Sequence, residues 1–305
     1  TYRDVIPQRI GGNRVSGFVS IMRGCNNFCH YCIVPYTRGT ERSRLETYIL
    51  QEVREFMERG GKEVMLLGQN VNAYGKDLGM TDGFTELLKH VSETGIARIR
   101  FDSSHPRDYS VTTIEAMRDY PNIMPSLHLA VQSGSNNVLK RMNRGYTAEH
   151  YLSLVEQMKT MIPTMTFSTD LIVGFPQETD ADFAQTIKLV DTCRFDQVYS
   201  FIYSPREGTP AAMMKDDVPL SVKQERLQIL NQHINYWAHE NNQAYIHQDL
   251  EVLCEGPSKK NPDILAGYSR EFKLVNFRGQ NIQAGDIVKV HIEQAKSFSL
   301  DGKAV

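Results

Sequence analysis

The chain has 305 residues, 41% of them hydrophobic, which is enough apolar material for one large domain and a smaller one, or for two comparable domains. Its 34 basic and 36 acidic residues give a net charge of −2, so no overall basic excess attracts nucleic acid and any RNA contact must rest on local patches. No apolar run approaches the length of a membrane span and no N-terminal signal pattern is present, so we expect no membrane association.

Apolar periodicity predicts six strands that alternate with helices over the first two thirds of the chain. The expected strands are 17–22, 63–67, 97–102, 126–131, 165–173 and 196–202. The expected helices are 46–59, 84–94, 110–119, 147–161 and 179–193, with Thr147 and Thr179 as N-caps. This alternation predicts an α/β fold with parallel strands, and six units predict a partial (βα)6 TIM-like barrel rather than a complete barrel of eight.

The pattern of apolar and turn residues changes after residue 245. A long helix is expected over 221–243, with Ser221 as its N-cap after Pro219. Short β-like runs then alternate with Gly, Pro and Asn turns at 250–253, 272–277 and 287–292, which predicts a small β-barrel or sandwich. We therefore expect two domains, residues 1–242 and residues 243–305.

Cys25, Cys29 and Cys32 follow the first predicted strand at C-x3-C-x2-C spacing. A structural zinc site normally uses four ligands, whereas three thiolates can hold three corners of a 4Fe–4S cubane and leave the fourth iron open. Zinc stays an alternative, with His30 or His128 as the fourth ligand. An odd total of five cysteines, three of them clustered, argues against a secreted disulfide framework and for a cytoplasmic location.

Polar residues follow all six predicted strands, where the carboxyl ends of parallel strands meet and form ligand sites. An open iron at that end of a barrel indicates S-adenosylmethionine, whose amino and carboxylate groups can chelate it. Tyr31 offers a flat face for adenine or packs within its loop, and Arg144 pairs with the carboxylate or lies exposed. The predicted cofactor-binding residues are Tyr31, Gly68, Gln69, Asn70, Ser103, Ser104, Gln132, Arg144 and Asp170.

Several segments resemble the radical S-adenosylmethionine (SAM) methylthiotransferases, and the resemblance is strongest to the MiaB type that modifies tRNA. The segments that carry it are 20–44, 66–75, 128–135, 142–147, 170–179 and 203–211. Residues 243–303 resemble a TRAM domain, a small β-barrel associated with RNA binding. The chain is thus identified as a member of this family over nearly its whole length.

The resemblance implies that Cys25, Cys29 and Cys32 bind the radical-generating 4Fe–4S cluster. It implies a transferase that uses S-adenosyl-L-methionine both as methyl donor and as radical source. The product would be 2-methylthio-isopentenyladenosine on the 3′ side of the tRNA anticodon. It further implies a cytoplasmic monomer that binds the tRNA anticodon stem-loop and takes electrons from a flavodoxin-type protein.

One departure from the family pattern is large, because the family has an N-terminal domain with three further cysteines that hold a second cluster. The chain begins at Thr1 and has no second cysteine triplet. We expect a piece cut between that domain and the barrel, able to bind one cluster and cleave SAM but not to insert sulfur. The alternatives are the related methylthiotransferase that acts on a ribosomal protein aspartate, which residues 35–39 and 68–72 disfavour, and a non-catalytic RNA-binding relic.

Overall fold

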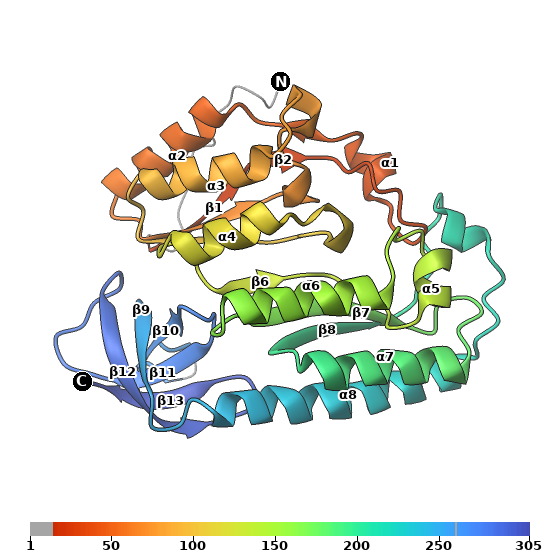
Figure 1. Ribbon diagram of the computed structural model, residues 1–305. Coiled ribbons are helices and arrows are strands. Elements are labelled where there is room, and N and C mark those ends of the chain that lie inside the picture. The colour runs from red at the N-terminus through yellow and green to blue at the C-terminus, as the bar shows by residue number, and fades with distance from the viewer. Residues whose placement is uncertain (1–14, 260) are drawn as a thin grey trace.

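The computed structural model describes residues 15–259 and 261–305, in which an α/β barrel is followed by a small β-barrel (Figure 1). Residues 1–14 of the expected first domain lie outside the described part. The parallel barrel strands are β1 (Ser16–Ser20), β4 (Glu63–Leu67), β5 (Arg98–Phe101), β6 (Ser126–His128), β7 (Thr166–Val173) and β8 (Gln197–Ile202). A two-stranded ribbon of β2 (Met22–Arg23) and β3 (Arg42–Ser43) lies beside β1.

The six strands form one curved sheet in the order β1-β4-β5-β6-β7-β8, with β1 and β8 at its edges. Two three-stranded sheets make up this order, and parallel bridges between Ile99 and Ile123 and between Ser104 and Leu129 join them. The predicted partial (βα)6 barrel is confirmed. β6 is shorter than the predicted strand because its pairing continues past His128 only through isolated bridges.

Helices cover the outside of the barrel and bury their apolar faces against the strands. The long ones are α2 (Glu46–Glu58), α3 (Gly83–Glu93), α4 (Val111–Asp119), α6 (Ala148–Met161), α7 (Asp180–Cys193) and α8 (Leu220–Gln243). Two short helices, α1 (Val34–Arg38) and α5 (Asn136–Arg141), lie near the cysteine loop, and single helical turns occupy Val71–Ala73, Lys76–Leu78, Pro106–Asp108 and Pro210–Met213.

The N-caps of two helices follow the sequence prediction and a third does not. Thr147 accepts a hydrogen bond from the His150 N–H, and Thr179 forms a reciprocal capping box with Asp182. Ser221 is not a cap, because α8 already begins at Leu220. Pro219 occupies the cap position there, with an extended ψ of 145° and no N–H that needs a partner.

The C-terminal strands form a closed barrel in the order β10-β11-β13-β12-β9. They are β9 (Asp249–Pro257), β10 (Leu265–Ser269), β11 (Leu274–Arg278), β12 (Ile287–Ala295) and β13 (Leu300–Ala304). A separate apolar core fills this barrel. The predicted strand 272–277 starts too early, since Phe272 lies in the β10–β11 turn at φ +62°. The expected division at 242/243 stays a prediction, and in the structure α8 ends at Gln243.

The small barrel packs against one end of the α/β barrel, and the cysteine loop lies at the other end (Figure 1). Arginines of β5 donate hydrogen bonds to its backbone, from Arg98 Nη1 to Tyr268 O at 2.7 Å and from Arg100 Nη2 to Ser269 O at 2.7 Å. The C-terminal barrel therefore closes the mouth formed by the amino ends of the strands. Within the described residues, no helix combines the length and apolarity needed to cross a membrane.

Candidate functional site

The three cysteines lie in the loop between β2 and α1, at the carboxyl end of the parallel strands. Cys29 is buried and the other two are half-buried. Gly24 begins the loop at φ +80°, and a Cβ there would lie 2.0 Å from the Thr40 carbonyl oxygen, so only glycine fits. The Gly24 N–H donates to Gln69 Oε1 at 2.6 Å, which fastens the loop to the end of β4.

The cysteine thiols affect one another's charge. Burial raises the pKa of the Cys25 thiol to about 11, and the Cys29 and Cys32 sulfurs add to this rise. Burial also raises the pKa of Cys32. Because a metal binds the thiolate, these cysteines need positive charge close by to ionise. A cationic cluster supplies such charge, and so does the arginine that contacts Cys29.

Arg144 is that arginine, and it is only 4% exposed. Its Nη1 donates to Cys29 Sγ at 3.3 Å and to the Tyr31 hydroxyl at 3.2 Å, while Nη2 donates to the Ala130 carbonyl at 2.6 Å. Its Nε donates to the Tyr146 hydroxyl at 3.0 Å. Arg144 is therefore not an exposed arginine but a fixed donor to a cysteine sulfur, a contact that the sequence did not indicate.

The ends of β4 and β5 carry buried polar atoms without partners. Asn70 Oδ1, Ser104 Oγ and His105 Nε2 are buried, and in the described structure none of them has a hydrogen-bond partner. Burial lowers the pKa of His105 to about 2, and Arg144 contributes, so the ring is neutral. Its Nδ1 accepts from the Arg107 N–H at 3.3 Å, which leaves Nε2–H as a free donor. A polar ligand would satisfy the hydrogen bonds that these atoms lack.

His105 was not among the predicted site residues. Its signal in the sequence was its place directly after Ser104, in the same cluster at the end of a strand. The sequence could not show that the imidazole would be buried and that one ring nitrogen would have no partner.

The remaining predicted residues divide between two places. Gly68 lies beneath the loop, where a Cβ would approach the Met22 side chain to 2.7 Å. Ser103 and Gln132 have φ of +66° and +73°, and the Gln132 N–H donates to the Asp170 carbonyl at 2.9 Å. Ser103 and Asp170 line a cavity deeper in the barrel that residues of the C-terminal barrel also line. Their roles toward the cofactor stay predictions.

The two histidines considered as zinc ligands have other contacts. His128 Nδ1 lies 3.0 Å from Ser168 Oγ and its Nε2 lies 3.4 Å from Asp170 Oδ2, inside the barrel, and His30 Nδ1 lies 2.7 Å from the Arg141 carbonyl. Within residues 15–259 and 261–305, no three His, Cys, Asp or Glu side chains converge on a single-ion position. A cubane suits separated thiolates, since each sulfur binds its own iron.

Comparisons with known proteins show the family to which the chain belongs. Residues 19–190 match the family profile of the Radical SAM superfamily, and residues 243–305 match that of the TRAM domain. The chain belongs to the radical SAM superfamily. Membership implies a 4Fe–4S cluster and S-adenosylmethionine as cofactors, and the three-cysteine loop fits that cluster.

Curated relatives include two enzymes named tRNA-2-methylthio-N(6)-dimethylallyladenosine synthase. The one from Bacillus subtilis is 52% identical over 298 residues, and the one from Staphylococcus saprophyticus is 50% identical over 298 residues. Each alignment covers 97% of this chain and 58% of the relative, so the chain spans little more than half the length of these proteins.

Two solved structures share the fold at low sequence identity. The radical SAM methyltransferase TsrM from Kitasatospora setae aligns with a TM-score of 0.53 at 14% identity, over 65% of this chain and 38% of its own. Coproporphyrinogen III oxidase (HemN) from Escherichia coli aligns with a TM-score of 0.52 at 18% identity, over 84% of this chain and 67% of its own.

Proposed function

We propose that this chain is the radical-generating and RNA-contacting part of a tRNA methylthiotransferase. Its substrate would be N6-dimethylallyladenosine in tRNA, which it would convert to the 2-methylthio form. The observation that carries the proposal is the 52% identity over 97% of the chain to a synthase named for that product. The cysteine loop and the C-terminal TRAM domain support it, since they supply a radical site and a module associated with RNA binding.

In this proposal Cys25, Cys29 and Cys32 hold one 4Fe–4S cluster, which when bound supplies the electron that cleaves SAM. Arg144 stabilises the Cys29 thiolate through its 3.3 Å hydrogen bond. The unpartnered atoms of Ser104, His105 and Asn70 are one hydroxyl, one N–H donor and one amide oxygen. They would hydrogen-bond the polar groups of the cofactor.

We extend the proposal to the parts that the resemblance implies and that residues 1–305 do not contain. A second 4Fe–4S cluster, needed for sulfur insertion, would be held by residues outside this chain. The tRNA contact would be the anticodon stem-loop, the electron donor a flavodoxin-type protein, and the working form a cytoplasmic monomer.

The test is anaerobic reconstitution of the 305-residue chain with iron and sulfide. We expect about four irons per chain and dithionite-dependent release of 5′-deoxyadenosine from SAM. The variant with Cys25, Cys29 and Cys32 all changed to Ala should do neither. An iron count near eight, or a loaded chain that releases no 5′-deoxyadenosine, would contradict the proposal.

The RNA part is tested by fluorescence anisotropy with an anticodon stem-loop. We expect the chain to bind the stem-loop with an affinity that falls as salt rises, because phosphate contacts release counterions. Binding that is absent, or that prefers a ribosomal protein to the stem-loop, would contradict the tRNA assignment.

A further inference from the structure

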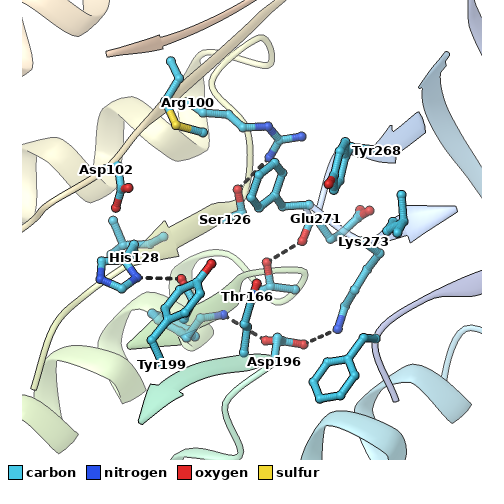
Figure 2. A pocket seen from close by; sticks show the side chains of 18 of the residues that line it. Arg100, Asp102, Ser126, His128, Thr166, Asp196, Tyr199, Tyr268, Glu271 and Lys273 are labelled. Atoms are coloured by element: carbon cyan, nitrogen blue, oxygen red, sulfur yellow. Dashed lines mark hydrogen bonds and ion pairs between the residues drawn. The ribbon is translucent and has the colours of Figure 1, made fainter. Parts of the chain in front are cut away.

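A cavity of about 640 Å³ lies where the barrel lumen meets the C-terminal barrel, at the end of the α/β barrel opposite the cysteine loop (Figure 1). Figure 2 shows that Asp102, His128 and Tyr199 approach it from the barrel side and Tyr268 and Glu271 from the C-terminal barrel. Its volume is within the range of small-molecule sites. The proposed function does not use its chemistry.

The charges that line this cavity do not balance. Its wall contains two permanent cations, and each already has an acidic partner: Arg100 Nε lies 2.8 Å from Glu63 and Lys273 Nζ lies 2.6 Å from Asp196. His128 also lines the cavity, and its Nε2 lies 3.4 Å from Asp170 Oδ2. Three further carboxylates, those of Asp102, Asp170 and Glu271, also line the cavity. Among the described residues no Lys or Arg side chain forms an ion pair with these three, so a ligand in the cavity meets a net negative wall.

The wall also contains a buried hydrogen-bond acceptor that lacks a donor. Asn242 is only 3% exposed, and its Nδ2 donates to the carbonyls of Lys296 and Ser297 at 2.7 and 3.1 Å. Its Oδ1 is buried and has no partner within the described residues. A buried acceptor without a donor is costly, and a ligand N–H would satisfy it.

The strong donors of the wall are engaged elsewhere. Arg100 donates to Ser126 Oγ at 2.7 Å and to the carbonyls of Ser269 and Arg270 at 2.7 and 3.0 Å, in addition to its bond with Glu63. The cavity therefore presents acceptors to a ligand, and its guanidinium and ammonium donors are already committed to protein atoms. Within the described residues, an anionic ligand would therefore meet no Arg or Lys of the wall that lacks an acidic partner.

Aromatic faces complete the wall. Tyr199 is 46% exposed, Phe298 is 62% exposed, and Phe272 stacks on Tyr268 with ring centroids 4.8 Å apart. Aromatic faces attract ammonium groups and pack against methylene chains. Glu271 lies on the opposite side of the cavity from Asp102 (Figure 2), so the carboxylates would meet a ligand at separate points. A single metal ion could not bridge them.

We propose that this cavity binds an organic polycation, a linear amine with at least two ammonium groups joined by methylene chains. One ammonium lies between Asp102 and Asp170, another meets Glu271, and the chain crosses the aromatic faces. An N–H of the ligand donates to Asn242 Oδ1. Because the site joins both barrels, the amine stabilises the way in which the C-terminal barrel closes the α/β barrel.

The test is isothermal titration of the 305-residue chain with spermidine at fixed ionic strength. We expect one saturable site with a Kd below about 1 mM. Glu271→Gln and Asp170→Asn should each weaken binding about tenfold, because each removes one charged partner. Glu93→Gln, an exposed acid at the end of α3, is the matched control and should leave the Kd unchanged.

Three results would overturn the proposal: the absence of saturable binding, a Kd that Glu271→Gln leaves unchanged, and equal competition by Mg²⁺ or by adenosine. Glu271 has no side-chain ion pair within the described residues, so its substitution should not unfold the chain, and circular dichroism checks this. The titration needs neither cluster nor SAM. It can therefore fail while 5′-deoxyadenosine formation succeeds, or succeed while that reaction fails.

Discussion

At the scale of single residues, Arg144 makes the sharpest connection between structure and chemistry. Arg144→Lys keeps the charge but cannot supply Cys29 Sγ, Tyr31 and the Ala130 carbonyl from one planar fork. Mutation of a residue that hydrogen-bonds a metal ligand typically lowers activity 10- to 100-fold. We expect the variant to bind iron normally and to form 5′-deoxyadenosine about 10- to 100-fold more slowly, measured by single-turnover assay.

The matched control for Arg144→Lys is Arg118→Lys. Arg118 lies exposed on α4, where its ion-pair partner among the described residues is its neighbour Asp119. Its rate of 5′-deoxyadenosine formation should equal that of the unchanged chain. If Arg144→Lys also keeps the full rate, the hydrogen bond to Cys29 has no part in the reaction.

The sequence could predict which residues lie at the site better than what each of them contacts. The polar strand ends predicted Gln69 and Ser104 there, because parallel strands bring their carboxyl ends together. Arg144 was predicted from its charge and its bidentate geometry. The hydrogen bond from the Gly24 N–H to the Gln69 side chain depends on side-chain positions that tertiary packing sets. The same is true of the burial of His105 Nε2 without a hydrogen-bond partner among the described residues. A one-dimensional pattern does not contain that information.

At the scale of elements, the start of α7 depends on a buried carboxylate. Asp182 accepts from Ser135 Oγ at 2.5 Å and from the Thr179 N–H at 3.0 Å, which joins α7 to the start of α5. Burial raises the pKa of Asp182, but these hydrogen bonds outweigh it and hold the pKa at about 2. We expect Asp182→Asn to lower the free energy of unfolding by about 1–3 kcal/mol at pH 7, measured by urea denaturation.

The loss of stability in Asp182→Asn should depend on pH, in the direction set by the lowered pKa of Asp182. The pKa of Asp182 is lower in the folded chain than in the unfolded chain, where it is near 3.8. The carboxylate therefore stabilises the fold fully above about pH 4, and this contribution is lost as the pH falls toward 2. The two chains should converge in stability between pH 4 and pH 2. Glu93→Gln, at an exposed site on α3, should show no such pH dependence.

Periodicity predicted the barrel strands because each has an apolar face, and it missed two strands of the C-terminal barrel for a physical reason. β10 and β13 each have a glycine at an inward position, where the partner strand comes very close. A Cβ on Gly267 would lie 2.1 Å from the Leu253 carbonyl oxygen, and one on Gly302 would lie 2.2 Å from that of His291. Close packing of the strands requires glycine at these two positions, but glycine in a sequence suggests a turn. The sequence pattern therefore did not predict β10 and β13.

At the scale of the whole molecule, the two barrels are joined through buried charge. Arg100 is 2% exposed, and it bonds Glu63 within the α/β barrel and the backbone of Ser269 and Arg270 in the C-terminal barrel. In the sequence, this arginine is an unremarkable polar residue within a strand. The sequence predicted both barrels but could not show that the second closes the mouth of the first.

The last prediction concerns this connection. Arg100→Met leaves Glu63 as an unpaired buried carboxylate and leaves two carbonyls without donors, so the free energy of unfolding should fall by about 3–5 kcal/mol. We expect the two barrels to unfold together in the unchanged chain, and calorimetry of the variant should resolve a separate transition for each barrel. Adding Glu63→Gln should recover part of the loss, because it removes the unpaired charge without restoring the contacts between barrels. A double variant no more stable than Arg100→Met alone would show that the buried charge is not the main cost, and a single transition in Arg100→Met would show that other contacts couple the barrels.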